Sequence, residues 1–320
     1  MTDRAAAGLQ VEGSSNSMTD SARVPGSALR THARYTYSPI VRRAPFRWPN
    51  GARLAVYFAL GLEQYSFGEG LTEDLVPAMP APDVLNTSWR DYGNRVGAWR
   101  ILDAFRGQGT PLAILLNSAL CEHAPELVES CHAAGCELIA HGYSNSDTMA
   151  GMSEADEAAY LRRVALQLQG VTGKPPAGWS SPWIAETALT PDLLQETGYG
   201  YLLDWCMDDQ PVWIRTRGGR ILSVPYSQEI NDSSAIIGRK VGAEEFSGMI
   251  IDQFEEMRQT PGNEPLVMSV VLHSFISGQP FRLRALRRAL AHIANSEEPL
   301  WITQPGAIAS YFQSLQASSV

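Results

Sequence analysis

The chain has 320 residues, of which 44% are hydrophobic and 18% are charged. This length and composition predict one packed globular domain and exclude a largely disordered chain. The formal net charge of −9, without any dense run of basic residues, argues against nucleic acid as a partner.

The N-terminal residues 1–34 are rich in Ala, Ser, Gly and polar residues without periodicity, which predicts a flexible extension. Met18 could be the natural start, so residues 1–17 need not belong to the native protein. The chain shows no secretory signal and no run of ~18 apolar residues, so we expect a soluble cytoplasmic protein without a membrane partner. Residues 35–320 are expected to form a single barrel domain.

Beyond the extension, short apolar runs alternate with helical patterns. The first run, 53–60, is almost continuously apolar, which predicts a strand covered on both faces. Residues 63–93 carry Gly, Pro and Asp without period and predict a long irregular loop. Further strands are predicted at 112–116, 137–140, 177–180, 201–204, 221–225, 265–272 and 300–302, and helices at 96–106, 124–134, 154–169, 191–197, 243–259 and 281–294.

This alternation predicts an α/β fold, a distorted (β/α) barrel of seven or eight parallel strands, and we expect the barrel to be closed. In such barrels the chemistry lies where strands end and enter loops. Polar residues stand at those ends in this chain: Glu63, Asn117, Ser118, His141, Ser180, Ser181, Asp204, Tyr226 and His273.

Three of these strand-end residues are candidates for catalysis. Glu63 could act as a general base or bind a metal, although a solvated loop acid is the alternative. His141 begins the segment HGYSN, and His273 can exchange protons near neutral pH, so we assign His273 as a general acid. For each of these two residues, a hydrogen-bonded structural histidine is the alternative. A second histidine four residues after His141 would complete a metal pair, but that residue is Asn145, and an amide binds zinc poorly.

Other polar and aromatic residues are candidates for shaping a binding pocket. Arg95 can hold a carboxylate or imide oxygen through paired N–H groups, whereas Trp99 has the helical spacing of a core residue. Asp208 could position a histidine or be an exposed turn acid. The four cysteines form no C-x-x-C pair and are expected to be reduced thiols. The candidate binding residues are Tyr92, Arg95, Asn145, Ser181, Trp183, Asp208 and Tyr226.

These motifs resemble the polysaccharide deacetylase superfamily and, within it, the branch of bacterial metal-independent allantoinases and cyclic imide hydrolases. The resemblance covers roughly residues 40–315. It rests on residues 47–56 (RWPNGARLAV), 92–100 (YGNRVGAWR), 136–143 (CELIAHGY), 208–213 (DDQPVW), 224–226 (VPY), Asn231-Asp232, Leu272-His273 and 278–280 (GQP).

The resemblance also shows where the chain departs from the superfamily. Its deacetylases carry two acids after the first strand and an H-x-x-x-H pair, whereas here Gly61 and Glu63 occupy the acid positions and Asn145 replaces the second histidine. Serine stands where the fourth-strand motif has arginine. Only Glu63 and His141 remain as metal ligands, and two protein ligands would hold zinc weakly. We therefore expect no cofactor, with a divalent metal such as zinc as the weaker alternative.

The resemblance implies a hydrolase of non-peptide carbon–nitrogen bonds that opens a cyclic amide, imide or ureide ring. Glu63 would activate water, and His273 would protonate the departing nitrogen. Ser181 or backbone donors would stabilise the oxyanion, and His141 would orient water or Glu63. A metal-dependent N-deacetylase of an acetylated saccharide and an inactive small-molecule binding protein are the alternatives. The expected partners are a small-molecule substrate and further copies of the chain, because members of this branch are commonly homo-oligomers.

Overall fold

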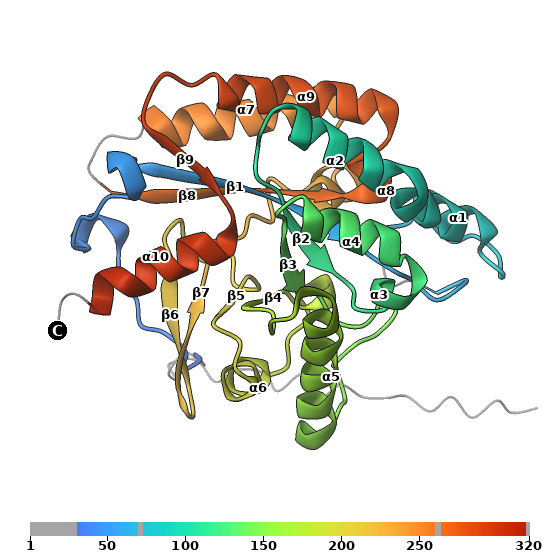
Figure 1. Ribbon diagram of the computed structural model, residues 1–320, viewed down its shortest axis with the longest axis horizontal. Coiled ribbons are helices and arrows are strands. Elements are labelled where there is room, and N and C mark those ends of the chain that lie inside the picture. The colour runs from blue at the N-terminus through green and yellow to red at the C-terminus, as the bar shows by residue number, and fades with distance from the viewer. Residues whose placement is uncertain (1–30, 70–72, 260–263, 318–320) are drawn as a thin grey trace, which may run out of the picture. The chain divides into compact units, whose positions relative to one another are not determined.

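The computed structural model describes residues 31–69, 73–259 and 264–317 (Figure 1). The chain divides into two units, Met1–Ala33 and Arg34–Val320, and the described helices and strands belong to the second. Most of the predicted extension lies outside the described residues, but Arg34 at its end forms an ion pair with Asp192. None of the described helices combines the length and the apolar character needed to cross a membrane.

A curled, mostly parallel sheet organises the second unit. Its strand order is β6-β7-β5-β4-β3-β2-β1-β8, β9 also pairs with β1, and β6 and β7 form the antiparallel pair. The predicted α/β barrel fold is confirmed in this distorted form. The strands are β1 (Leu54–Leu62), β2 (Ala113–Leu116), β3 (Glu137–Ala140), β4 (Gly178–Trp179), β5 (Tyr201–Leu202), β6 (Val212–Thr216), β7 (Gly219–Ser223), β8 (Leu266–His273) and β9 (Leu300–Thr303).

The barrel is not closed, contrary to our expectation. Among the described residues, β6 and β8 are the two ends of the ladder. Loop backbone bridges the open side, because the Val267 N–H donates to the Asp209 carbonyl and the Val271 N–H donates to that of Ile230. The sheet is therefore a half-barrel whose seam is covered by the loops around residues 209 and 230.

Most of the helices pack against the outer face of this sheet, whereas α10 contributes Ile308 and Ala309 to the hydrophobic cluster on the other face. In Figure 1, α7 and α9 lie side by side above β8 and β1, and α10 follows β9. The helices are α1 (Val84–Tyr92), α2 (Ala98–Gly107), α3 (Leu120–His123), α4 (Pro125–Ala133), α5 (Glu154–Thr172), α6 (Thr190–Thr197), α7 (Ala243–Gln259), α8 (Ser274–Ser277), α9 (Pro280–Ala294) and α10 (Pro305–Ala317).

Strand alternation separates two hydrophobic clusters on the two faces of β1. Leu54, Val56 and Phe58 belong to the cluster shared with the helices, whereas Ala55 and Tyr57 belong to the inner cluster. Side chains two residues apart share a face of a strand. The inner face of β1 therefore continues past its last apolar residues toward the strand's carboxyl end, where the polar residues begin.

The segment 63–93, predicted to be an irregular loop, contains a helix that the sequence analysis did not predict. Helix α1 begins after Asp83, whose side chain accepts a hydrogen bond from the Asn86 N–H. Its buried residues are polar, namely Asn86, Thr87 and Arg90, while Val84 is exposed. Apolar residues do recur at helical spacing, but Val84 and Leu85 among them are exposed, so the apolar side of this helix does not face the core. The edge strand β6 was missed for a related reason, since only one of its residues is buried.

Candidate active site

Glu63 lies at the carboxyl end of β1, on the inner face of the half-barrel. Its side chain is 4% exposed, and its Oε1 lies 3.3 Å from His273 Nε2 and 3.6 Å from His141 Nε2. His141 follows β3, and His273 ends β8 with its Cα paired with that of Gly61. Three strand ends that are distant in sequence thus bring one carboxylate and two imidazoles together.

His273 is held from its other side by Asp232. The imidazole Nδ1 donates to Asp232 Oδ1 at 2.6 Å, and the His273 backbone N–H donates to Oδ2 at 2.9 Å. The Ser277 hydroxyl also donates to Oδ2, at 2.5 Å. Asp232 is fully buried, so these contacts fix the orientation of the His273 ring and direct Nε2 toward Glu63.

The charges of this group reinforce one another. Burial acts to raise the pKa of Glu63, but the charge of His273 and the nearness of both imidazoles outweigh it and hold this pKa below its usual value. Burial acts to lower the pKa of His273, yet Glu63 and Asp232 raise it well above its usual value. At neutral pH the site therefore holds a carboxylate base beside a protonated imidazole.

The ring of His141 is fixed by the neighbouring strand. Its Nδ1 donates to the Ser180 carbonyl at 2.8 Å, which leaves Nε2 facing Glu63. Asn145, four residues further on, is buried, and its Oδ1 accepts a hydrogen bond from Asn117 at 3.0 Å. Asn117 also donates to the His141 carbonyl. Asn145 therefore helps to hold the loop after β3 in place.

Glycines allow the backbone to approach this cluster closely. A Cβ added at Gly97 would lie 2.0 Å from the Ser274 carbonyl oxygen, and one at Gly278 would lie 2.4 Å from the Cα of Gly97. The turn before α2 thus packs directly on α8, the helix that follows His273. This contact holds the end of β8 in position, which explains why glycines occur here within otherwise helical segments.

Two predicted binding residues lie beside the cluster. The Trp183 indole N–H donates to the Asn145 carbonyl at 3.1 Å. Tyr226 is buried, and burial, then Tyr57 and Glu63, raise its pKa well above the usual value. The structure thus places both aromatic residues near the residues that converge around Glu63.

Ser181 does not have the environment of an oxyanion donor. Its backbone N–H donates to Asp204 Oδ1 at 2.7 Å, and its hydroxyl donates to Asp204 Oδ2 at 2.6 Å. Its hydroxyl oxygen also accepts from the Trp179 indole at 2.9 Å. Both donors are already used by a buried carboxylate, so the geometry argues against the role predicted for Ser181.

Asp208 does not position a histidine, contrary to one of the two predictions. Its carboxylate forms a paired ion contact with Arg43, at 2.7 and 2.5 Å, and accepts from the Gln210 N–H. The acid that positions a histidine is instead Asp232, which contacts His273 Nδ1. The pair Asn231-Asp232 stood in the sequence among the motifs of the resemblance, and this was the signal that could have identified it.

Tyr92 and Arg95 are placed away from the cluster. The Tyr92 hydroxyl accepts a hydrogen bond from Arg100, and the Arg95 side chain is exposed. Among the described residues, neither side chain bonds to Glu63 or to the two histidines. Trp99, predicted in the core, is 38% exposed. From this segment it is Asn94 that contacts the site, because its side chain donates a hydrogen bond to the Glu63 carbonyl at 2.7 Å.

The residues at the site do not fit a zinc centre. A Cβ at Gly61 would lie 3.2 Å from both Glu63 Oε1 and the His273 ring, so a second acid there would displace its neighbours. Asn145 directs its oxygen to Asn117. Across the described ranges, no three His, Cys, Asp or Glu side chains are arranged to hold a metal ion. The four cysteines, all within these ranges, are free thiols.

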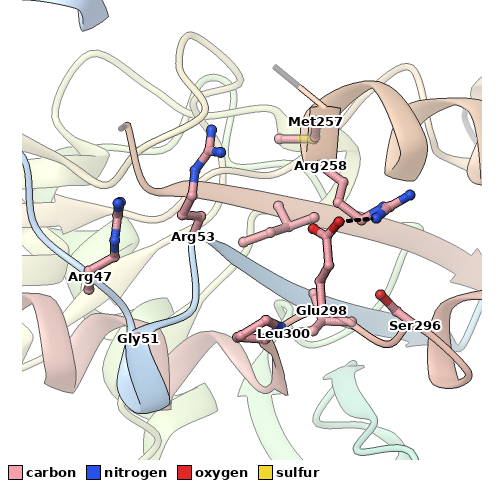
Figure 2. A pocket seen from close by; sticks show the side chains of 10 residues that line it. Arg47, Gly51, Arg53, Met257, Arg258, Ser296, Glu298 and Leu300 are labelled. Atoms are coloured by element: carbon pink, nitrogen blue, oxygen red, sulfur yellow. Dashed lines mark hydrogen bonds and ion pairs between the residues drawn. The ribbon is translucent and has the colours of Figure 1, made fainter. Parts of the chain in front are cut away.

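A pocket at the opposite end of the sheet lacks acid–base groups. Figure 2 shows Arg47, Arg53 and Arg258 around this cavity of 200 Å³, with Arg258 paired with Glu298 at 2.5 Å. It lies beside Leu54 and the start of β9, at the amino ends of the strands. Its only acid is ion-paired and no histidine lines it, so we place the candidate active site at the other end.

Comparisons with known proteins agree with this fold. The polysaccharide deacetylase family model matches residues 89–202. A protein of Schizosaccharomyces pombe named "Putative polysaccharide deacetylase" is 25% identical over 293 residues, which cover 82% of this chain and 91% of that protein. The peptidoglycan deacetylase of Helicobacter pylori is 24% identical over 245 residues, covering 66% and 82%. The solved structure of Puue allantoinase has a TM-score of 0.76 and 26% identity, covering 88% and 98%.

The fold and these relatives support one class of enzyme: a hydrolase of carbon–nitrogen bonds other than peptide bonds, built on an α/β half-barrel. The chain has the fold of the solved allantoinase and is similar in sequence to polysaccharide deacetylases. The predicted resemblance is therefore confirmed.

Proposed function

We propose that this protein opens a cyclic amide, imide or ureide ring by acid–base hydrolysis without a metal ion. The observation that carries the proposal is the position of His273 between two carboxylates, Asp232 on Nδ1 and Glu63 on Nε2. At the same pH, Glu63 is an ionised base and His273 is a protonated acid, and the two side chains are in direct contact.

The proposed reaction uses these two groups in turn. Glu63 removes a proton from water as the water oxygen bonds to the ring carbonyl carbon. The carbon–nitrogen bond then breaks, and the nitrogen takes the Nε2 proton of His273. Proton transfer from Glu63 back to His273, across their 3.3 Å contact, restores both groups. The products are a carboxylic acid and a released N–H group in one opened chain.

The donor set of this site supports a ring substrate rather than an acetamide. A cyclic imide or ureide carbonyl is activated by strain or by its electron-poor nitrogens, so it needs less electrophilic help than an ordinary amide. Asn145 stands where the resemblance places a metal-binding histidine, and a side chain at Gly61 would press against Glu63 Oε1 and the His273 ring, each 3.2 Å from the added Cβ. We infer that a site without the metal ligands of the deacetylases acts on an activated ring rather than on an acetamide.

Deacetylation of an acetylated saccharide is the second candidate. The family model over residues 89–202 and the deacetylase names of the two sequence relatives favour it. This reaction breaks the same kind of acyl–nitrogen bond, but an unactivated acetamide normally calls for a metal ion as Lewis acid. It therefore predicts activity that depends on a divalent metal.

One experiment separates the two candidates. Purified protein is treated with a chelator and offered hydantoin, succinimide, allantoin and an N-acetylglucosamine oligomer, and ring opening or acetate release is measured. We expect ring opening at an undiminished rate after chelation. Acetate release that is lost on chelation and returns with zinc would establish the deacetylase instead. Tight binding of a ring compound without turnover would point to a binding protein.

A further inference from the structure

Tyr65 connects Glu63 to a second carboxylate in the loop before α1. Its hydroxyl lies 2.5 Å from Glu63 Oε2 and 3.3 Å from Glu73 Oε2. Asn145 donates to the same hydroxyl oxygen at 3.5 Å. A phenol has one proton to donate, and the shorter distance gives that proton to Glu63. Burial and then Glu63 raise the pKa of Tyr65 well above its usual value, so the hydroxyl keeps this proton.

The ring of Tyr65 is held on several sides. It makes edge contacts with Trp183 and Phe275, at ring-centre distances of 6.4 and 6.2 Å. The guanidinium of Arg90, on α1, lies 4.6 Å from the ring centre. Such contacts fix a side chain more firmly than its hydroxyl bond alone, because the aromatic ring has few rotamers and is packed in this one.

Glu73 ties the same loop to the segment that holds His273. Its Oε1 accepts a hydrogen bond from the Ser233 hydroxyl at 2.6 Å. Ser233 directly follows Asp232, the carboxylate on His273 Nδ1. Glu63 is therefore held from both sides: Tyr65 contacts Oε2, and His273, itself held by Asp232, contacts Oε1.

We infer that Tyr65 is a positioning residue for Glu63: its hydroxyl holds Oε2 and thereby presents Oε1 to the two histidines and to the attacking water. The inference rests on the proposed role of Glu63 as the base. Without this bond the Glu63 side chain can rotate about several torsions. A base that leaves its productive geometry is a poorer catalyst even when its charge is unchanged. Glu73 and Ser233 hold the loop so that Tyr65 stays in reach.

The first test replaces the hydroxyl alone. In Tyr65→Phe the ring keeps its contacts with Trp183, Phe275 and Arg90, so the fold should persist. We expect kcat to fall roughly 10- to 100-fold with KM little changed. The matched control is Tyr199→Phe, because Tyr199 is equally buried and donates only to the Leu161 carbonyl, at 3.2 Å. A Tyr65→Phe enzyme that keeps its kcat, or loses only affinity and melting temperature, would overturn the inference.

A double-mutant cycle tests whether Tyr65 acts through Glu63. Single-turnover rates are measured with enzyme in excess for Glu63→Gln, Tyr65→Phe and the double variant. We expect Tyr65→Phe to cost nothing further once Glu63 is replaced, because residues that act as one unit are not additive. Multiplied losses in the double variant would mean that Tyr65 acts independently of Glu63, and the inference would be wrong.

A substrate-free measurement separates this inference from the proposed function. Crystal structures of the wild type and of Tyr65→Phe show directly where the Glu63 carboxylate lies. We expect it to rotate away from His273 in the variant. If it keeps its 3.3 Å contact with His273, the positioning role fails whatever the substrate is. If the carboxylate does rotate while the wild type opens no ring, the proposed function fails and the positioning role stands.

Discussion

The two ends of the half-barrel bury opposite kinds of residue. At the carboxyl ends of the strands, Glu63 and His273 face the interior. At the amino ends, Trp48 packs against Trp301 and Tyr311 at ring-centre distances of 5.6 and 5.8 Å. In barrel enzymes the carboxyl end carries the chemistry and the amino end contributes stability. Mutations at the two ends should therefore change different measured quantities.

The largest effect is expected at the carboxyl end, from Glu63→Gln. Glutamine has nearly the same shape and can accept the Tyr65 hydrogen bond, but it cannot take a proton from water. We expect kcat to fall roughly 10³- to 10⁴-fold, because general-base catalysis is removed. Initial rates of ring opening, together with a thermal melt by circular dichroism, measure the two quantities. A variant with more than a tenth of the wild-type kcat would show that Glu63 is not the base.

The matched control for this variant lies at the opposite end. Glu298→Gln also neutralises an ion-paired glutamate, the one that contacts Arg258 beside the arginine-lined pocket. Its side chain is more than half exposed, and an exposed ion pair contributes little to stability. We expect kcat within about twofold of the wild type. A large loss of kcat here would break the functional division between the two ends.

The next effect concerns stability and comes from Trp48→Ala. Trp48 is 1% exposed, and its indole N–H donates to the Leu266 carbonyl at 2.9 Å. Removing the ring leaves a cavity and removes the hydrogen bond to this carbonyl, so the free energy of unfolding should fall by about 3–5 kcal/mol. Urea unfolding measures this loss, and kcat is measured at a temperature where the variant is still folded. We expect kcat to stay near the wild-type value; a fall comparable to that of Glu63→Gln would refute the comparison.

A smaller but more specific effect is expected from Asp232→Asn. Asp232 is one of the two carboxylates that raise the pKa of His273, so its loss should lower that pKa. The protonated acid is then lost at a lower pH, and the basic limb of the kcat profile should move to lower pH. The acid limb depends on Glu63, whose pKa is held low, and should move little. We expect kcat at neutral pH to fall by about 10²-fold, as measured from pH–rate profiles of both proteins.

An unshifted basic limb in Asp232→Asn would show that His273 is not the general acid. The nearby Ser277→Ala provides the control, because it removes one hydrogen bond to Asp232 and leaves the carboxylate's charge in place. Its profile should keep the wild-type limbs.

The sequence predicted most of the fold because β1 and its neighbours are nearly continuous apolar runs. Helix α7 has the predicted bounds 243–259, and β3 has the predicted bounds 137–140. Of the elements that were missed, α1 buries polar residues and β6 lies at an edge with a single buried residue. Helix α10 was missed as well, although it buries Ile308 and Ala309. Sequence also cannot say whether a ladder closes, and here loop backbone, rather than a strand, covers the seam beside β8.

The site residues at strand ends could be predicted from the sequence, whereas those whose positions depend on loops could not. Glu63, His141 and His273 follow inward-facing strand positions, so their convergence follows from the barrel itself. Whether Asp208 or Asp232 meets a histidine depends on how the loops cross the open seam. Asn231 pairs with Val271 there, and this contact brings Asp232 to β8. No local pattern in the sequence encodes that contact.

A small effect on catalysis is also expected from Ser181→Ala, which tests the correction made by the structure. If Ser181 supplied an oxyanion donor, its loss should lower kcat by roughly 10²- to 10³-fold. Because its hydroxyl donates to the buried Asp204, we expect instead a loss of stability of about 1–3 kcal/mol with kcat within about threefold of the wild type. Urea unfolding and initial rates on the same preparation distinguish the two. A 10²-fold loss of kcat without destabilisation would return Ser181 to the oxyanion role and place part of the chemistry on β4 as well.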